Sequence, residues 1–195
     1  MNATNPLAPA LTHMGIFTDN PEAMQEFYVR VLGMLVSDAG SGVLFRRRII
    51  FMTGDPHQHH QFVLVVREQG DPPGGALFQV SFKVRTLAEL RRLAALAVAN
   101  GATELQGINH GNSWSVYFRD PDKNMVEIYV DTGWYVPQPF GDRLALELDD
   151  REIQAITAER VKSVAGSMAQ SEWSDRIRVR LDEQRSGTAP DRPRR

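Results

Sequence analysis

An internal duplication constrains the fold of this 195-residue chain more than any other feature of its sequence. Residues 11–18 are typical of a strand, residues 21–32 have helical spacing with one apolar face, and short strand-like stretches follow. The same order of a strand, a helix and further strands returns from residue 76 onward. The duplication predicts two βαβββ modules that together form one cupped mixed sheet, which is an α+β fold.

A constant offset of 66 residues relates the two copies, since 79 − 13 = 66 for His13 and Gln79. The same offset pairs Asn20 with Thr86, Met24 with Leu90, and Gln61 with Glu127. Asn20 and Thr86 have side chains that favour helix N-caps, so we expect each to begin the helix of its module. Because one offset holds from the first strand to the last, chance alignment of two short units is a poor explanation.

The chain is expected to divide into a paired domain, an extension and a tail. The two modules occupy residues 8–70 and 74–132 and form one domain over 8–132. Residues 133–185 form a C-terminal extension, in which helices are expected to start near residues 149–150 and 171. We expect this extension to pack on the domain or on a second subunit of a homo-oligomer, a dimer or higher. Residues 186–195, rich in Pro, Gly and Arg, are expected to be a disordered tail.

Composition and charge exclude several classes of function. The formal net charge of −2 gives no support for a nucleic-acid partner, and no apolar run is as long as a membrane span. The chain has no cysteine, which removes disulfides, thiolate metal sites and cysteine nucleophiles. The first residues lack the basic and apolar regions of a signal peptide, so we expect a cytoplasmic protein. Gly-rich phosphate loops and the G-x-S-x-G motif are also absent.

Three side chains are placed where strands of the two modules would converge on one cavity. His13 lies in the first strand of the first module, Gln79 in the first strand of the second, and Glu127 in the last strand of the second. An imidazole, an amide and a carboxylate suit Fe(II), Mn(II) or a similar ion better than a thiolate-preferring metal. The alternative is that His13 is a hydrogen-bonded core or edge residue, as most strand histidines are.

The other histidines gather just before strands, where functional residues are often found. His57, His59 and His60 precede one strand, and His110 precedes another. A neutral imidazole in such a place can take up or give a proton near neutral pH, and a polar loop residue is the alternative for each. Tyr117 follows on the next strand, where its hydroxyl either orients a bound oxygen or reaches the surface from the core.

Residues 109–129 (NHGNSWSVYFRDPDKNMVEIY) resemble the C-terminal signature of the glyoxalase, bleomycin-resistance and extradiol-dioxygenase proteins, the vicinal oxygen chelate superfamily. Residues 11–14 (LTHM), with Tyr28 and the pair 32–33, look like the opening of such a module. The resemblance spans roughly residues 8–135. Residues 131–139 (DTGWYVPQP) look like an extension of single-domain members similar to catechol dioxygenases.

The resemblance implies a role for each candidate residue. In type I extradiol dioxygenases two histidines and one glutamate hold Fe(II), and His13 and Glu127 match the first and third of these ligands. His60 matches the histidine that acts as an acid or base beside bound dioxygen. His110 and Tyr117 match residues that bind the substrate oxygens. The implied reaction inserts both atoms of O2 into a small aromatic substrate, a catechol, and cleaves the ring beside its hydroxylated carbons, with both reactants on the metal.

Three positions depart from this pattern. Gln79 stands at the second metal histidine, and its amide oxygen is a weaker donor than imidazole, although glutamine is a ligand in some glyoxalases. Gln61 stands where a glyoxalase I would have an additional glutamate, which argues against a four-ligand site of that kind. Lys123 replaces the usual glycine of a D-P-x-G-N turn. A positive φ is expected in that turn, so we expect a small local cost or an adjustment at Asn124.

We therefore expect an extradiol-dioxygenase-like oxidoreductase in which His13, Gln79 and Glu127 surround Fe(II), Mn(II) or another divalent ion. The first alternative is a metalloenzyme of the same scaffold with glyoxalase-like or isomerase-like chemistry. The second alternative is a metal-free protein that binds small aromatic molecules, of the bleomycin-resistance type. Gln79 is the residue that keeps this last alternative open.

Overall fold

The computed structural model describes residues 10–41, 47–71 and 77–186. The chain begins with β1 (Met14–Thr18), α1 (Pro21–Leu32), β2 (Leu35–Ser41), β3 (Arg48–Thr53) and β4 (Phe62–Val66). It continues with β5 (Val80–Lys83), α2 (Leu87–Ala99), β6 (Thr103–Asn109), β7 (Ser113–Arg119) and β8 (Met125–Asp131). The expected succession of a strand, a helix and three strands is therefore present twice.

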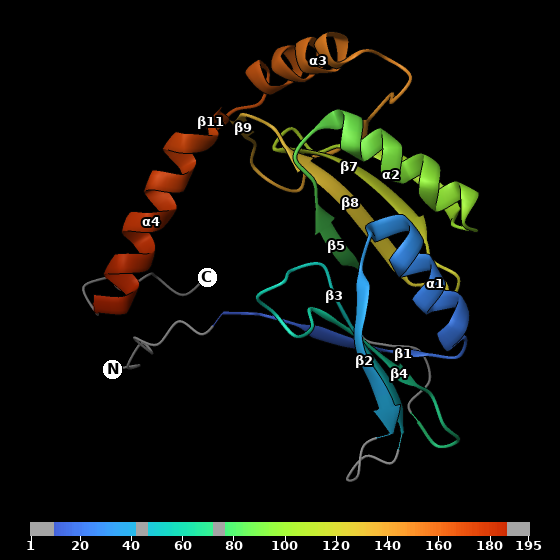
Figure 1. Cartoon of the computed structure of the whole chain (residues 1–195). Helices are drawn as coiled ribbons and strands as arrows, with labels where there is room; N and C mark the ends of the chain where they lie inside the picture. Colours follow the sequence, from blue (N-terminus) through green and yellow to red (C-terminus); the bar gives the residue numbers. More distant parts are fainter. Residues whose placement is uncertain (1–9, 42–46, 72–76, 187–195) are drawn as a thin grey trace.

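The strands of the two repeats form two mixed sheets (Figure 1). The first has the strand order β1-β4-β3-β2, and the second has the order β10-β6-β7-β8-β5, where β10 is Asp142–Arg143. β1 runs parallel to β4 and β5 runs parallel to β8, whereas the other pairs are antiparallel. The predicted α+β fold with mixed sheets is confirmed. The single cupped sheet is divided in two, because β1 and β5 each end their own sheet in the described chain.

The core lies beneath α1 and α2, which are in contact with each other (Figure 1). Each helix buries one face at helical spacing, as the sequence predicted. The largest fully buried side chains are Tyr28, Phe27, Phe62, Phe118, Met24, Ile50, Met52, Leu64, Leu90, Ile128, Val31 and Val116. The core-facing residues of β3, β4, β7 and β8 in this set have even numbers, so the odd-numbered residues of those strands point away from the helices.

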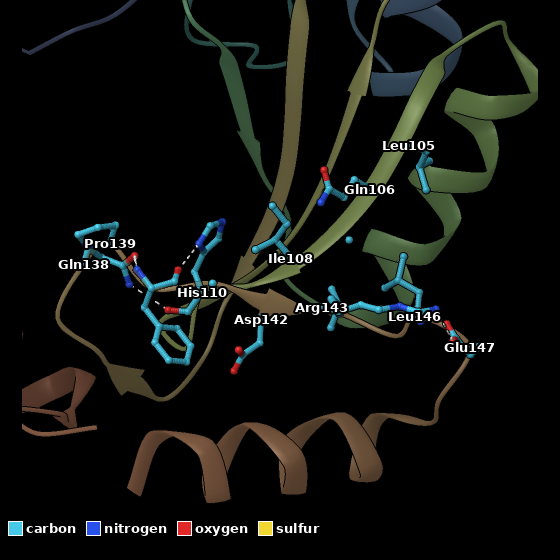
Figure 2. A pocket seen from close by; sticks show the side chains of 14 residues that line it. Leu105, Gln106, Ile108, His110, Gln138, Pro139, Asp142, Arg143, Leu146 and Glu147 are labelled. Atoms are coloured by element: carbon cyan, nitrogen blue, oxygen red, sulfur yellow. Dashed lines mark hydrogen bonds and ion pairs between the residues drawn. The ribbon is translucent and has the colours of Figure 1, made fainter. Parts of the chain in front are cut away.

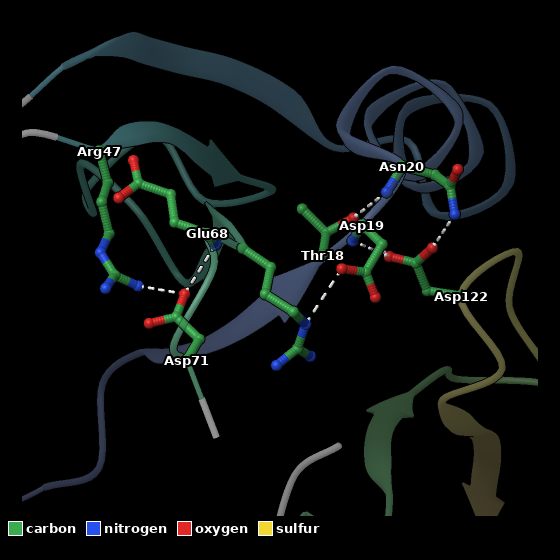
Figure 3. Close-up of polar contacts among 8 residues, drawn as sticks. Thr18, Asp19, Asn20, Arg47, Glu68, Asp71 and Asp122 are labelled. Atoms are coloured by element: carbon green, nitrogen blue, oxygen red, sulfur yellow. Dashed lines mark hydrogen bonds and ion pairs between the residues drawn. The ribbon is translucent and has the colours of Figure 1, made fainter. Parts of the chain in front are cut away.

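The two helix starts differ in how their caps are used. Thr86 accepts a hydrogen bond from the backbone N–H of Glu89 at 3.1 Å, so the predicted cap of α2 is confirmed. Asn20 stands at the N-cap of α1 but makes no side-chain cap bond. Its amide donates instead to Asp122 Oδ1 at 2.5 Å, and the hydroxyl of Thr18 also donates to Asp122 (Figure 3). Asn20 therefore joins the two modules rather than capping its own helix.

The pairing of strands shows where the repeat keeps its offset and where it does not. Met14 pairs with Phe62 on β1 and β4, and Val80 pairs with Val126 on β5 and β8. The first strands keep the predicted offset, since 80 − 14 = 66, but the last strands are related by 126 − 62 = 64. The connection before β4, residues 54–61, is longer than the turn before β8, residues 120–124, so the two modules differ in their loops.

The shorter offset corrects one expectation about the site. Because β4 and β8 are related by 64 residues, the counterpart of Glu127 is Val63 rather than Gln61. Val63 is apolar and cannot bind a metal ion. The conclusion against a four-ligand site stands, but it rests on Val63.

A buried polar contact joins the modules beneath α1. Tyr28 donates to Asp120 Oδ2 at 3.1 Å, and both residues are fully buried. Asp120 Oδ1 also accepts the backbone N–H of Asn124 at 2.9 Å, which closes the turn before β8. Burial raises the pKa of Asp120, and the hydrogen bonds from Asn124 and Tyr28 oppose that rise. Lys123 has a φ of 68°, so lysine itself takes the left-handed conformation expected in this turn.

Changing Tyr28 to phenylalanine is expected to lower the free energy of unfolding by about 1–3 kcal/mol at neutral pH, because the buried carboxylate of Asp120 loses a donor. The Tyr28 hydrogen bond stabilises the ionised carboxylate, so its loss raises the pKa of Asp120 further. A raised pKa gives stability that is present at low pH and lost as pH rises. The destabilisation should therefore shrink as the pH falls toward the pKa of Asp120.

Urea unfolding of the wild type and of Tyr28→Phe at about pH 7 and about pH 4.5 measures this change. The wild type at each pH is the control for the general effect of acid. An equal loss of stability at both values would show that Asp120 does not receive the proton.

The C-terminal extension returns onto the second module. β9 (Trp134–Tyr135) and β10 lead to α3 (Asp150–Lys162), β11 (Met168–Ala169) and α4 (Gln170–Ser186). A capping box of Asp149 and Glu152 begins α3 as predicted. α4 points away from the sheets in Figure 1, and its Trp173 stacks on Tyr135 with ring centroids 5.3 Å apart. The predicted disordered tail lies outside the described residues beyond Ser186, and the expected packing on a second subunit stays a prediction.

One buried hydroxyl attaches α3 to the β6–β7 hairpin. Asn109 Nδ2 and Trp114 Nε1 each donate to Thr157 Oγ1 at 2.8 Å, and Thr157 is buried. Trp114 belongs to the core, so α3 is tied to the main body of the fold. Across the described ranges, no helix combines the length and the apolar character needed to cross a membrane.

Candidate active site

Glu127 is the centre of a polar row on the face of the second sheet that points away from α2. In the strand register, Glu127 lies opposite Tyr117 of β7 on one side and Ser81 of β5 on the other. Tyr117 donates to Glu127 Oε1 at 2.6 Å, and Ser81 donates to Oε2 at 2.6 Å. Gln79 Nε2 also donates to Oε2, at 2.9 Å. Glu127 is 7% exposed, and these donors compensate for the burial of its charge.

His110 extends this row through Tyr117. His110 Nε2 lies 3.0 Å from the Tyr117 hydroxyl, and Nδ1 lies 2.8 Å from the carbonyl oxygen of Phe140. A carbonyl oxygen only accepts, so Nδ1 carries a hydrogen, and in the neutral ring Nε2 is the acceptor that faces Tyr117. Burial, followed by the hydrogen bond and charge of Glu127, raises the pKa of Tyr117 well above its ordinary range. The phenol therefore keeps its hydrogen at neutral pH.

The single hydroxyl hydrogen of Tyr117 cannot serve both of its partners at once. While Tyr117 donates to Glu127, Nε2 of neutral His110 faces the Tyr117 oxygen without a hydrogen between them, and a proton that reached Nε2 would be donated to that oxygen. When Glu127 carries a proton, Tyr117 can donate to His110 instead. The row of His110, Tyr117 and Glu127 therefore has room for one transferable proton, which is what an acid–base device requires.

Two of the three predicted metal ligands are brought together. Gln79 and Glu127 are hydrogen-bonded to each other, whereas His13 packs its ring against His60 with centroids 4.4 Å apart. His13 directly precedes β1 rather than lying in it, and if the alternation of β1 continued to residue 13, His13 would point away from the helices as Glu127 does. In the described part of the chain, no group of three or more His, Cys, Asp or Glu side chains is arranged to hold a metal ion.

His13, His59 and His60 form a cluster with Phe51 of β3. The Nδ1 atoms of His59 and His60 are 2.9 Å apart, and the ring centroids of Phe51 and His60 are 5.0 Å apart. Burial lowers the pKa of His60, and the neighbouring charges of His13 and His59 lower it further. The neutral ring of His60, which can accept a proton, is thereby favoured. His57 is exposed and uses its backbone N–H to close the preceding loop, as the alternative for that residue predicted.

A cavity of about 850 Å³ lies beside His110 (Figure 2). One wall is β6, from which Gln106 and Ile108 face the cavity, and the other wall is residues 138–147 of the extension. Gln106 is opposite Tyr117 in the strand register, so the cavity adjoins the polar row. The remaining lining combines apolar residues such as Pro139 with the charged residues Asp142, Arg143 and Glu147. Such a site can hold an apolar ring with a polar group directed at His110.

Sequence reasoning missed three contributors to this site. Ser81 had a signal, because it lies two residues after Gln79 and therefore shares its face of the strand. Gln138 was noticed only as part of an extended aromatic segment. Phe140 acts through its backbone carbonyl, for which the amino-acid sequence carries no signal.

Residues 10–128 match the Glyoxalase/Bleomycin resistance protein/Dioxygenase superfamily. The chain belongs to that superfamily. The resemblance inferred from residues 109–129 is therefore confirmed. The match ends before β9, so the extension that forms one wall of the cavity lies outside the superfamily segment.

Two curated relatives within the superfamily come from Rhodococcus globerulus. Biphenyl-2,3-diol 1,2-dioxygenase 3 is 30% identical over 135 residues, which cover 64% of this chain and 65% of that protein. Biphenyl-2,3-diol 1,2-dioxygenase 2 is 28% identical over 127 residues, which cover 63% of each chain. The aligned part of this chain thus spans slightly less than two thirds of the length of each relative.

Solved structures of the superfamily share the fold. A glyoxylase/bleomycin resistance protein/dioxygenase domain from Frankia sp. EAN1pec has a TM-score of 0.54 and 19% identity, covering 65% of this chain and 99% of that one. The fosfomycin resistance protein FosX from Mesorhizobium loti has a TM-score of 0.50 and 19% identity, covering 65% and 94% respectively. At such identities the likeness supports the fold and does not choose among the activities of the superfamily.

Proposed function

We propose that this protein is a ring-cleaving dioxygenase that acts with a divalent metal ion on a catechol-type aromatic diol and O2. The observation that carries the proposal is the hydrogen-bonded row of His110, Tyr117 and Glu127. These residues stand where the resemblance to extradiol dioxygenases expects two groups for the substrate oxygens and one metal ligand. Similarity to two biphenyl-2,3-diol dioxygenases supports the same class of reaction.

The donors near Glu127 fit a divalent ion in their chemistry. A half-turn of the Gln79 amide would bring its oxygen to the present place of Nε2, which is 2.9 Å from Glu127 Oε2. His13 would be the nitrogen ligand. An ion held by His13, Gln79 and Glu127 would supply charge transfer between the diol and O2.

The residues of the chain supply the binding and proton steps. A diol hydroxyl beside Tyr117 would be oriented by that hydroxyl and by His110, and its proton would move to His110 Nε2. The hydrogen on Nδ1, which donates to Phe140, holds the ring in the receiving orientation. His60, kept neutral beside His13, is the group for a proton on the O2 side. The cavity beside His110 would take the ring of the substrate.

A metal-free binding protein for aromatic molecules is the second candidate, and the same carboxylate favours it. Tyr117, Ser81 and Gln79 already donate to Glu127, so the carboxylate is satisfied by the protein alone. In this candidate the cavity binds the ligand, and Tyr117 with His110 orients its polar group.

Metal loading under anaerobic conditions separates the two candidates. Purified wild type and Gln79→His are incubated with Fe(II), desalted and measured by elemental analysis, and each is then mixed with catechols in air. We expect near-stoichiometric iron and ring-cleavage absorbance in the wild type, with tighter iron binding in Gln79→His, because imidazole is the stronger donor. Gln154→His, which places a histidine on the exposed surface of α3, is the control for adventitious binding.

Two outcomes would contradict the proposed dioxygenase. If only Gln79→His bound iron, the wild type would have the fold of the superfamily but no metal site. The metal-free binding protein would then be favoured. Iron in the wild type without ring cleavage of any catechol would indicate a different metal-dependent reaction of the superfamily.

A further inference from the structure

The side chain of Gln138 bridges the two backbone segments that hold His110. Gln138 Nε2 donates to the carbonyl oxygen of His110 at 2.9 Å, and to the carbonyl oxygen of Val136 at 3.2 Å. Gln138 Oε1 accepts the backbone N–H of Phe140 at 3.0 Å. One amide therefore fixes the distance between the His110 turn and the Phe140 turn. Figure 2 shows Gln138 and His110 side by side at the edge of the cavity.

The Phe140 carbonyl decides which nitrogen of His110 carries the hydrogen. Its oxygen lies 2.8 Å from Nδ1 and can only accept, so the Nδ1–H form of the neutral ring is stabilised. Nε2 is then left without a hydrogen in front of Tyr117, at 3.0 Å. If the carbonyl moved away, the two neutral forms would compete, and the Nε2–H form would point a donor at Tyr117.

The segment that carries Phe140 is held on its C-terminal side by α3 and by β6. Arg160 of α3 lies over the ring of Phe140 at 5.6 Å from its centroid, and it donates to Asp142 at 2.7 Å. Asp142 is paired with Asn109 in the β10–β6 ladder. On the N-terminal side of Phe140, the side chain of Gln138 links this segment to the His110 backbone.

We propose that Gln138 is a positioning residue that sets the tautomer of His110 through the carbonyl of Phe140. This inference rests on the proposed function in one respect, which is that the enzyme uses Nε2 as a proton acceptor. The tautomer itself is a property of the chain without metal or substrate. Gln138 lies in the C-terminal extension, outside the superfamily segment 10–128.

Glutamine is suited to this position because its amide has a donor and an acceptor at one end. Glutamate at residue 138 would still accept from Phe140 but would present a carboxylate to the carbonyl of His110. Leucine would fill the same space and make neither bond. Gln138→Glu therefore keeps the hydrogen bond from Phe140 and loses the one to His110, whereas Gln138→Leu loses both.

Nitrogen NMR of the chain labelled with ¹⁵N-histidine tests the inference, on metal-free protein at about pH 8, where neutral imidazole prevails. The His110 signals are assigned with His110→Gln. We expect the Nδ1–H form in the wild type, and a fall of about tenfold in the ratio of Nδ1–H to Nε2–H in both Gln138 variants. Gln154→Leu, an exposed glutamine changed in the same way on α3, should leave the ratio unchanged.

The result would overturn the inference if wild-type His110 carried its hydrogen on Nε2, or if both Gln138 variants kept the wild-type ratio. The thermal midpoint of each variant is measured to check that it folds. If Gln138→Leu does not fold, the test is made with Gln138→Glu. Where ring cleavage is found, the Gln138 variants should lower kcat with little change in KM. A tautomer shift without any ring cleavage would support the inference and contradict the proposed function, so the two fail separately.

Discussion

Changing Tyr117 to phenylalanine is expected to lower the kcat of ring cleavage by about 10²–10⁴-fold, the usual contribution of a positioned acid–base group. The substitution keeps the aromatic ring but removes the hydroxyl that lies 2.6 Å from Glu127 and 3.0 Å from His110. Proton transfer between those two residues then has no bridging group. Because burial and Glu127 raise the pKa of Tyr117, the wild-type hydroxyl is protonated at neutral pH, and the loss should not depend on pH there.

The measurement is the steady-state rate of ring cleavage by iron-loaded wild type and Tyr117→Phe, with iron content determined on the same samples. Tyr129→Phe is the matched control, since Tyr129 points from β8 to the same face and is opposite Ser115 in the register. We expect Tyr129→Phe to stay within a few-fold of the wild type. A Tyr117→Phe enzyme with full kcat would remove the proton row from the mechanism, whereas lost iron would mean that Tyr117 mainly supports the metal ligand.

The helices and their faces could be predicted from the sequence because their signals are local. Residues with N-cap side chains, a proline at the first helical position and apolar residues at helical spacing all lie within one segment. The start of α3 is predictable for the same reason, since Asp149 and Glu152 form a capping box three residues apart. Asn20 shows the limit of such signals, because its amide found a stronger partner in Asp122, which is distant in sequence.

The repeat predicted the pairing of elements but not the pairing of every residue. Counting by 66 placed His13 and Gln79 correctly at equivalent ends of β1 and β5, because the start of the strand and the start of the helix are equally far apart in both modules, 21 − 14 = 7 and 87 − 80 = 7. It failed at Gln61, since the connections inside the modules differ and one offset cannot show a loop of changed length. Equivalence in the last strands became visible only through the hydrogen-bonded register of β4 and β8.

The candidate site also contains residues that the sequence can place and residues that it cannot. Tyr117 and Glu127 could be placed side by side from the sequence, because both are central residues of neighbouring strands joined by a short turn. The attachment of His110 could not, since Phe140 contributes a backbone atom and Gln138 comes from a segment without regular structure. Long-range contacts made by an irregular extension leave no periodic pattern in the sequence.

Gly111 is a residue at which the extension packs closely against the His110 turn, and its replacement by alanine is expected to lower the stability of the protein strongly. Gly111 has a φ of +73°, and a Cβ built on it would lie 2.4 Å from Val136 Cγ2. A left-handed conformation costs an alanine about 1–2 kcal/mol, and overpacking adds about 1–3 kcal/mol. We therefore expect Gly111→Ala to lower the free energy of unfolding by about 2–5 kcal/mol.

Two other glycines separate these contributions. Gly33 also has a positive φ, +67°, but a Cβ there would meet nothing within 4 Å, so Gly33→Ala should show the conformational cost alone. Gly133 has neither a positive φ in that range nor a neighbour within 4 Å, so Gly133→Ala should be close to neutral. Subtracting the effect of Gly33→Ala from that of Gly111→Ala then gives the contribution of the contact with Val136.

Thermal and urea unfolding of the three variants measure these differences, and a loss of about 3 kcal/mol corresponds to roughly 6–12 °C in Tm for a chain of this size. If Gly111→Ala and Gly33→Ala lost equal stability, the contact between Val136 and Gly111 would contribute nothing. Val136→Ala in the Gly111→Ala background should recover part of the loss, because it removes the methyl groups that the new Cβ meets. The close approach at Gly111 brings residues 136–140 within reach of His110, so the same substitution should also weaken the hydrogen bond between His110 and Phe140.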